Sequence, residues 1–320
     1  MLTLRLACPT DLAAAALALF EADPTVSSLT IWRGASTKPA GDVIWADIPR
    51  ESANDLVTKL TDLGVQKSGT IQLVPVATWI SQSGLDAERS APGSSSDAVV
   101  WAEVVERAYD DTQLTWTYLS FMILATLLAA IAIVTDSIVL VIGAMVLGPE
   151  FTAIATLGLS IIKRRPNLLR QALRTLLIGF AVSIGVVAAL ALAAKGFGFI
   201  TEVDVLKPRP GTEFIYSPNW WSFLVAVVAG AAGVLSLTSS RTNGLVGVFI
   251  SVTTIPASGN IAIALVFGLW HEVIGSAAQL GINIGGMAIA GWLTLLFQQA
   301  VWARFNSRLA KRERPPQSTH

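Results

Sequence analysis

Apolar and polar residues follow different patterns in the two parts of this chain. Over residues 1–83, short runs with alternating apolar positions are separated by amphipathic segments and by turns that contain Gly or Pro. Alternation is typical of strands with one buried face, and amphipathic spacing is typical of helices. The order of the runs is β-α-β-β-α-β, which predicts a ferredoxin-like α+β domain. Such a domain can be a regulatory module that binds a ligand or partner, or a folding and assembly unit.

Beyond residue 113 the apolar runs become long enough to cross a lipid bilayer, which requires about 20 apolar residues. Six segments meet this requirement: Leu114–Val134, Ile138–Ile162, Leu168–Ala194, Trp220–Leu237, Leu245–Leu269 and Val273–Val301. We therefore predict an α-helical polytopic membrane domain over residues 114–302. A linker and a juxtamembrane helix occupy residues 84–113, and the Ser- and Gly-rich composition of Ser81–Ala98 predicts a flexible segment there. A basic cytoplasmic tail follows over residues 303–320.

The basic residues predict the orientation of the spans. Lys and Arg concentrate in Lys163–Arg174, at Arg241 and in Arg304–Arg314, which lie on one side if both termini are inside. Loops rich in Lys and Arg stay in the cytoplasm. The N-terminal sequence does not resemble a signal peptide, in agreement with this orientation. We expect a multi-pass protein of the plasma membrane with both termini cytoplasmic.

The second and fifth predicted spans share a pattern. Each has an apolar run, VIGAMV from Val141 or LVGVFI from Leu245, and each is interrupted near its middle by Pro149 or Pro256. Because the copies are three spans apart, they cross the membrane in opposite directions, so we predict two inverted three-helix repeats. Inverted repeats with broken helices are typical of secondary transporters. Proline kinks also occur in membrane helices without a transport role, where Ser or Thr satisfies the freed backbone groups.

Glu150 directly follows the first break. A carboxylate at mid-bilayer costs at least about 2.5–3.5 kcal/mol, so we expect it to face the bundle interior, either protonated or beside a bound cation. The second break offers hydroxyl and amide groups without charge. The predicted site for a small polar solute or ion comprises Gly148, Pro149, Glu150, Thr253, Thr254, Pro256, Ser258 and Asn260. Asp136 and His271 lie in turns at its predicted entrance, where Asp136 also fits a solvated interface residue.

Two stretches resemble a known family: DSIVLVIGAMVLGPEFTAIATLGLSI from Asp136 and GLVGVFISVTTIPASGNIAIALVFG from Gly244. They are similar to bacterial hydrophobic proteins grouped as domain-of-unknown-function family 389, which combine a VIGAM…P span with a later LVGVxI…P span. The GPEF form at Gly148–Phe151 resembles an actinobacterial branch that also carries an N-terminal α/β domain. The resemblance implies an inner-membrane location and supplies no substrate and no catalytic residues.

Composition excludes several classes of function. Hydrophobic residues make up 53% of the chain and charged residues 14%, against about 25% charged in soluble domains. The formal net charge is zero, which does not favour nucleic acid. Cys8 is the single cysteine and the chain has two His, so we expect neither a disulfide scaffold nor a metal site, and no cofactor.

Two functions remain for comparison with the structure. The first is a secondary transporter or ion pathway with Glu150 as its central group. The second is a membrane-anchored sensor whose cytoplasmic α/β domain binds a ligand or partner. We expect no enzyme, because no carboxylate pair and no nucleophile with a base are evident. Gly-rich faces of the spans favour a homo-oligomer.

Overall fold

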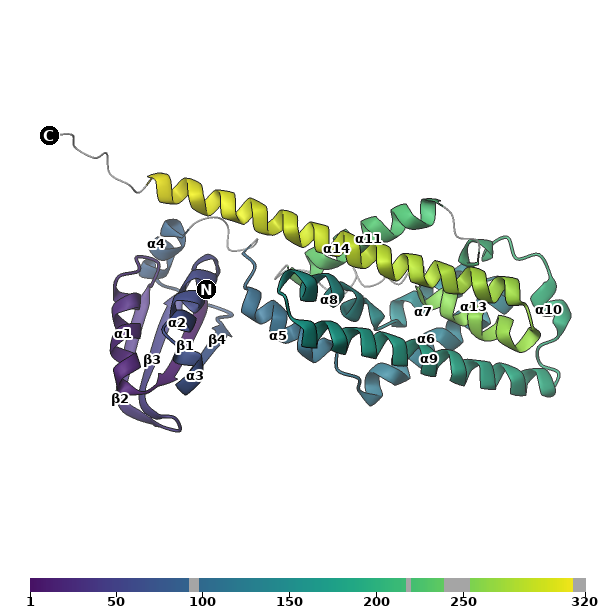
Figure 1. Cartoon of the computed structure of the whole chain (residues 1–320), viewed down its shortest axis with the longest axis horizontal. Coiled ribbons are helices and arrows are strands. Elements are labelled where there is room, and N and C mark those ends of the chain that lie inside the picture. The colour runs from purple at the N-terminus through teal and green to yellow at the C-terminus, as the bar shows by residue number, and fades with distance from the viewer. Residues whose placement is uncertain (92–97, 217–219, 239–253, 313–320) are drawn as a thin grey trace. The chain divides into compact units, whose positions relative to one another are not determined.

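The computed structural model describes residues 1–91, 98–216, 220–238 and 254–312 (Figure 1). The chain divides into two compact units: the first contains Met1–Val104, and the second contains Val105–Leu237 and the described residues from Thr254 to Ala300. We call them the α/β unit and the helical unit, and each is described by itself.

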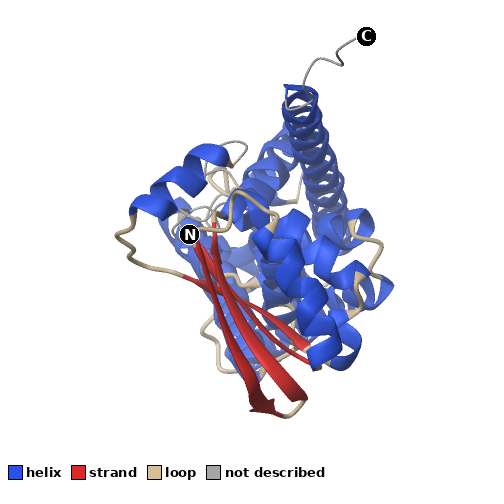
Figure 2. Ribbon diagram, turned by 90° about the vertical axis from the view of Figure 1, so that its left-hand side faces the viewer, coloured by secondary structure: helices blue, strands red, loops and turns tan. Residues whose placement is uncertain are grey.

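The α/β unit has the element order that the hydrophobic pattern predicted. Its elements are β1 (Leu2–Cys8), α1 (Thr10–Glu21), β2 (Ser28–Thr37), β3 (Ala40–Ile48), the 3₁₀ turn η1 (Arg50–Ser52), α2 (Ala53–Asp62), α3 (Val65–Ser68) and β4 (Thr70–Pro75). The four strands form one antiparallel layer in the order β2-β3-β1-β4 (Figure 2). The prediction of a β-α-β-β-α-β order is therefore confirmed.

Strict alternation along β1 decides which face of the sheet is buried. Leu2, Leu4 and Leu6 are almost completely buried, whereas the residues between them are partly exposed. The buried face packs in one core cluster with Phe20 of α1 and Leu56 of α2. The helices thus cover one face of the sheet, because side chains of a strand alternate between its two faces.

The prediction of a flexible linker over Ser81–Ala98 is wrong for helix α4 (Gln82–Ser90). The Ser81 side chain caps this helix by accepting a hydrogen bond from Gly84 N at 3.2 Å. A Cβ atom at Gly84 would lie 2.7 Å from the Trp79 ring, so the tryptophan packs directly on the helix backbone. Composition alone favoured a linker, but the cap and this ring contact stabilise a helix.

The α/β unit extends beyond the predicted boundary at residue 83. Val100 belongs to its core, and the Asn54 side chain donates to Val99 O and accepts from Trp101 N at 2.6 and 3.0 Å. Arg50 and Glu103 form an ion pair at 2.8 Å. These contacts attach the start of α5 (Trp101–Asp111) to the unit.

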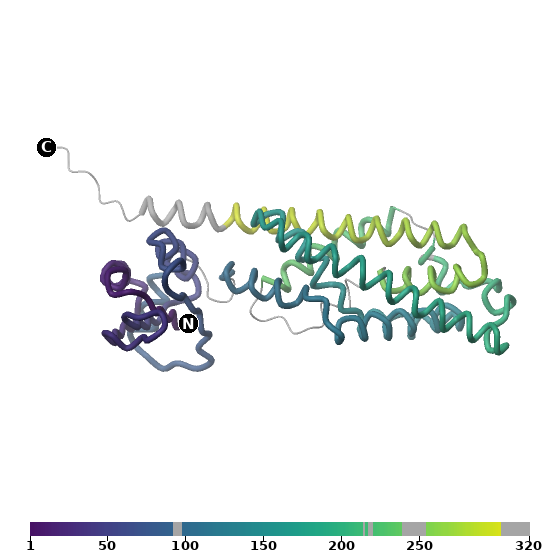
Figure 3. Tube along the Cα trace, turned by 60° about the horizontal axis from the view of Figure 1, so that its bottom comes forward, coloured from purple at the N-terminus to yellow at the C-terminus, as the bar shows by residue number. Residues whose placement is uncertain are grey.

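Four of the described helices are long and apolar enough to cross a membrane, and they lie wholly or mostly in the helical unit: α6 (Trp116–Thr135), α9 (Pro166–Gly196), α11 (Trp220–Thr238) and α14 (Trp270–Arg312). In α14 the apolar part is Trp270–Val301. Helices α7 (Ile138–Leu147) and α8 (Glu150–Ile162) are bent by 57° at a short break and form a fifth span if they are counted together. Helix α13 (Thr254–Phe267) is shorter, and the predicted residues Leu245–Thr253 before it lie outside the described residues. Figure 3 shows the long helices side by side along the unit.

Glycines allow α14 to approach its neighbours closely. A Cβ atom at Gly158 of α8 would lie 2.8 Å from Trp292 N, and one at Gly230 of α11 would clash with Met287 O. On α6, Ala129 lies 2.8 Å from the position of a Cβ atom at Gly259 of α13. Small residues at these crossings let the helix backbones come together, as in other membrane-type bundles.

Candidate functional site

The break in the α7–α8 span places Glu150 inside the helical unit. Helix α7 ends at Leu147, Gly148 and Pro149 form the break, and Glu150 is the first residue of α8. The Glu150 side chain is completely buried, with 0% exposure. At a helix N-terminus the free N–H groups favour a negative charge, which partly offsets the cost of burial.

Glu150 meets the second proline-containing segment at this point. Thr254, also 0% exposed, donates a hydrogen bond from Oγ1 to Glu150 Oε1 at 2.7 Å. Pro256 is buried two residues further along α13, whereas Thr253 lies outside the described residues. The structure therefore brings together the two segments that the prolines marked in the sequence.

Two further predicted residues continue along α13 as buried polar groups. The hydroxyl groups of Ser258 and Thr126 on α6 are 3.1 Å apart, and Ser258 donates to Ile255 O at 2.7 Å. Asn260 follows with 1% exposure. The polar residues of the second break thus lie on the inner side of α13 and make their contacts within the bundle.

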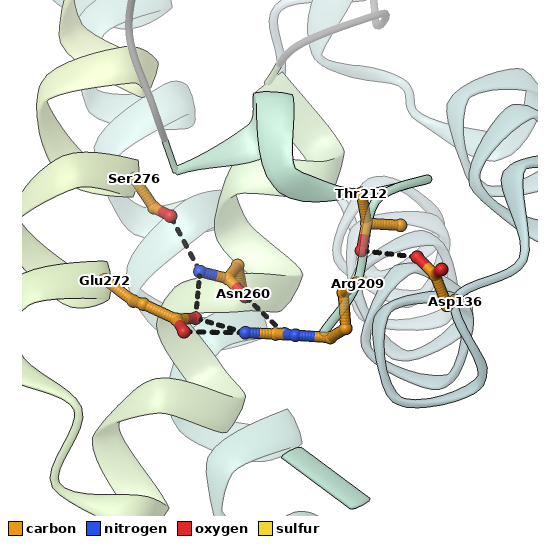
Figure 4. Close-up of polar contacts among 6 residues, drawn as sticks. All are labelled: Asp136, Arg209, Thr212, Asn260, Glu272 and Ser276. Carbon is orange, nitrogen blue, oxygen red and sulfur yellow. Dashed lines mark hydrogen bonds and ion pairs between the residues drawn. The ribbon is translucent and has the colours of Figure 1, made fainter. Parts of the chain in front are cut away.

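Asn260 belongs to a buried polar cluster that sequence reasoning did not identify (Figure 4). Its Nδ2 donates to Glu272 Oε2 at 3.2 Å and to Ser276 Oγ at 3.0 Å. Arg209, whose side chain is 2% exposed, donates to both carboxylate oxygens of Glu272 at 2.6 and 2.8 Å. Arg209 comes from the segment between α10 (Glu202–Leu206) and the 3₁₀ turn η2 (Glu213–Ile215). The segment therefore folds onto the α13–α14 turn.

The two residues predicted at the entrance have different surroundings. Asp136 ends α6 in the left-handed conformation, with φ of 50°, and accepts hydrogen bonds from Thr212 Oγ1 at 3.0 Å and Gly211 N at 3.4 Å. Asp136 therefore anchors the same segment that carries Arg209 (Figure 4). His271 is exposed and lies outside this cluster.

Gln279 and Asn283 are the second feature that sequence reasoning missed. Together with Glu272 and Ser276 they recur at helical spacing and line one face of α14. Gln279 is 1% and Asn283 0% exposed, and their amide groups have no hydrogen-bond partner among the described residues. The signal was present in the sequence as polar residues at i, i+4, i+7 and i+11 of an apolar span.

Contacts between α13 and α14 show how far along the bundle the amides of Gln279 and Asn283 lie. Helices α13 and α14 are joined by a tight turn, and Asn260 contacts Glu272 and Ser276. Thr254 lies about 9 Å from Asn260 along α13, away from the turn. The same distance along α14 from its contacts with Asn260 leads to the region of Leu280, which is therefore level with Thr254. Thr254 and its partner Glu150 therefore lie at the depth of Gln279 and Asn283.

The packing of α8 gives the same depth independently. Helices α7 and α14 both start at the end of the unit where Asp136 and Arg209 lie, so α8 and α14 run in the same general direction (Figure 1). Gly158 of α8 lies against Trp292 of α14. About 12 Å before this contact, α8 has reached back to Glu150 and α14 to the region of Asn283. The two residues therefore lie at a similar level along the bundle.

The arrangement offers oxygen and amide groups and little charge. We call Glu150, Thr254, Ser258, Asn260, Gln279 and Asn283 the polar track. Glu150 is its one ionisable member. Beside Asn260, at one end of the track, Arg209 and Glu272 form an ion pair that adds no net charge. Among the residues that the structure describes, no group of three or more His, Cys, Asp or Glu could hold a metal ion.

Part of the chain matches a family model, and the matched residues include the polar track. Residues 145–289 match the model described as Domain of unknown function (DUF389). The chain is also 22% identical over 229 residues to the uncharacterized protein MJ0678 of Methanocaldococcus jannaschii, covering 71% of this chain and 67% of the relative. No solved structure matches the chain. The family resemblance is thereby confirmed as a match to this domain model over residues 145–289.

Proposed function

We propose that this protein is a membrane transporter or ion pathway that moves a small polar solute or cation along the polar track. The observation that carries the proposal is the hydrogen bond between Glu150 and Thr254. It joins a fully buried carboxylate to the second proline-containing segment, and such residues within membrane domains commonly mark substrate or ion routes. A structural role alone does not require a carboxylate in the interior, because an apolar residue there would avoid the cost of desolvation.

The unpartnered amides support passage rather than permanent packing. A buried polar group without a hydrogen bond costs about 1–3 kcal/mol. Gln279 and Asn283 together provide two amide oxygens and two amide nitrogens at the depth of Glu150. A polar solute, a hydrated cation or water would satisfy these groups.

The charge of the track favours a cation or proton over an anion. Arg209 and Glu272 are paired bidentately, so this pair adds no net charge. Glu150 then contributes a single negative charge that a monovalent cation or a proton balances. An anion would meet that charge without a compensating cationic group in the track.

The proposal includes the arrangement of the spans in the membrane. The six predicted spans would form two inverted repeats, with the α7–α8 break in one and the start of α13 in the other. Both termini would be cytoplasmic in the plasma membrane. The exposed apolar side chains of the long helices, such as Leu177 at 70% and Val228 at 69%, are available to lipid or to a second copy of the chain.

Flux through reconstituted protein tests the proposal. Proteoliposomes containing an internal pH-sensitive dye report proton flux, and uptake of rubidium reports flux of a monovalent cation. Glu150→Gln should abolish flux in either assay. Glu202→Gln is the matched control, because it removes a carboxylate that is 70% exposed in α10 and should leave flux unchanged. If wild-type vesicles carry flux that survives Glu150→Gln, the central role of Glu150 is ruled out.

The α/β unit gives a second candidate, the membrane-anchored sensor. On the open face of its sheet, the rings of Trp32 and Trp45 lie 4.9 Å apart and are 42% and 38% exposed. The Arg5 guanidinium stacks on Trp45 at 4.2 Å. Exposed aromatic groups on a rigid sheet are typical of a recognition surface. If Trp32→Ala/Trp45→Ala abolishes the cellular phenotype and Glu150→Gln leaves it intact, the sensor replaces the transporter.

A further inference from the structure

A polar cavity lies beside the first turns of α9. It has a volume of about 570 Å³, and its lining includes Tyr109, Gln113, Asn167, Arg170, Gln171 and Arg174. All of these residues belong to the helical unit. Because α9 continues from this point as one of the long apolar helices, the cavity lies at the boundary between polar and apolar surface.

Hydrogen bonds between α9 and the α5–α6 connection hold the floor of the cavity in place. Gln171 Nε2 donates to Tyr109 O at 2.8 Å and to Thr112 Oγ1 at 3.2 Å. Thr175, which is 1% exposed, donates from Oγ1 to Thr112 O at 2.7 Å. The cavity is therefore preformed by the fold, which lowers the entropic cost of binding.

Arg170 and Arg174 give the cavity its charge. They are one helical turn apart on α9, and both side chains are exposed. No carboxylate among the described residues forms an ion pair with either of them. Two guanidinium groups at this spacing can both donate to one phosphate.

A second cavity adjoins the first and is apolar. It has a volume of about 560 Å³, shares Arg170 and Arg174 with the polar cavity, and continues along Leu173, Leu177 and Ile178. Leu173 is 42% and Leu177 70% exposed, in a segment of α9 that the sequence predicts to lie in the bilayer. The two arginines therefore stand at the junction of a polar and an apolar groove.

We propose that the adjoining cavities bind one phospholipid with an anionic head group. Its phosphate lies between Arg170 and Arg174, its polar head group occupies the cavity beside Gln171, and an acyl chain runs along Leu173 and Leu177. Basic pockets at the ends of membrane helices bind anionic head groups in this way. A soluble phosphate would leave the apolar groove unfilled, and a zwitterionic lipid would leave the charge of the arginine pair uncompensated.

Lipid retention by the purified full-length chain tests the proposal. The protein is held in detergent with equal amounts of phosphatidylglycerol and phosphatidylcholine that have identical acyl chains, and native mass spectrometry counts the retained lipids. Wild type should prefer phosphatidylglycerol roughly 30-fold, as expected for two basic contacts. Arg170→Gln/Arg174→Gln should remove this preference. Arg164→Gln/Arg165→Gln removes the same charge from residues that line neither cavity, and should retain it.

A second variant tests the apolar groove separately. Leu177→Gln keeps both arginines and should lower retention of phosphatidylglycerol. Leu177 is 70% exposed, so this substitution should leave the packing of the helices unchanged. The proposal is overturned if wild type shows no preference, if both arginine pairs have equal effects, or if Leu177→Gln changes nothing. It is also overturned if inorganic phosphate displaces the retained lipid, because the site would then be one for soluble anions.

Discussion

The hydroxyl group of Thr254 donates a 2.7 Å hydrogen bond to the carboxylate of Glu150, and both side chains are fully buried. The two residues are 104 positions apart in the sequence and belong to the two segments that proline interrupts. Their contact gives the proposed route a defined centre, and the amides of Gln279 and Asn283 lie at its depth.

Thr254→Val should destabilise the helical unit, because it removes a donor from a buried carboxylate while preserving the shape of the side chain. Hydrogen bonds to charged groups contribute about 1.5–3 kcal/mol. We expect a lower Tm in detergent, measured by intrinsic fluorescence. Thr254→Ser keeps the hydroxyl and should lie closer to wild type. Equal Tm values for Thr254→Val and wild type would contradict the contribution assigned to this bond.

Arg209 and Glu272 should behave as a coupled pair in a double-mutant cycle. Their side chains are 2% and 16% exposed, so removing one partner leaves the other charge largely buried. Each of Arg209→Gln and Glu272→Gln should cost about 3–5 kcal/mol of stability. The double variant should cost much less than the sum of the two, as measured by chemical denaturation. Additive effects would show that the pair does not interact as the geometry indicates.

Gly158→Ala should loosen the crossing of α8 and α14. The added Cβ atom would lie 2.8 Å from Trp292 N, a backbone atom that cannot move without shifting α14. Overpacking of this kind costs about 1–3 kcal/mol. Gly185→Ala on α9 is the control, since no atom lies within 4 Å of the new Cβ position. Thermal unfolding should separate the two variants, and an equal response would argue against the close crossing.

Cys8 should resist alkylation in the folded α/β unit. The thiol is completely buried, and burial together with the nearby Asp42 and Asp11 raises its pKa above the ordinary value of a cysteine. As the pH rises past the ordinary pKa of a cysteine, the unfolded chain loses a proton that the folded chain keeps, so the stability of the fold should decrease. Iodoacetamide labelling followed by mass spectrometry measures how far the thiol resists alkylation, and denaturation at several pH values measures the change in stability. Rapid labelling at neutral pH without denaturant would be inconsistent with a buried thiol.

Patterns of neighbouring residues predicted most of the helices and strands, because alternation, helical spacing and proline act over short stretches of the chain. Alternation along β1 matched its buried face, and the prolines at 149 and 256 marked the segments that contain Glu150 and Thr254. Helix α4 was missed because its stabilising contacts, such as Trp79 against Gly84, are specific to the fold and leave no compositional signal.

The remaining site residues depend on long-range packing. Arg209 lies in an irregular segment, and only the folded chain brings it to Glu272. Gln279 and Asn283 could have been found from their helical spacing, but the same pattern also occurs on helices that face water. Their burial in an apolar helix is a property of the bundle.

The accessibility of the Glu150–Thr254 contact to water-soluble reagents decides whether the polar track can serve as a route for ions. In a Cys8→Ala background, Thr254→Cys is compared with Ala262→Cys, because both positions lie on α13 with 0% exposure and Ala262 is packed in an apolar cluster. Membrane vesicles are treated with a small cationic methanethiosulfonate reagent. We predict that Thr254→Cys reacts many times faster than Ala262→Cys, because the proposed route would admit small cations to the polar track. Equally slow reaction at both positions would mean that the track is dry, and would contradict its role in passage.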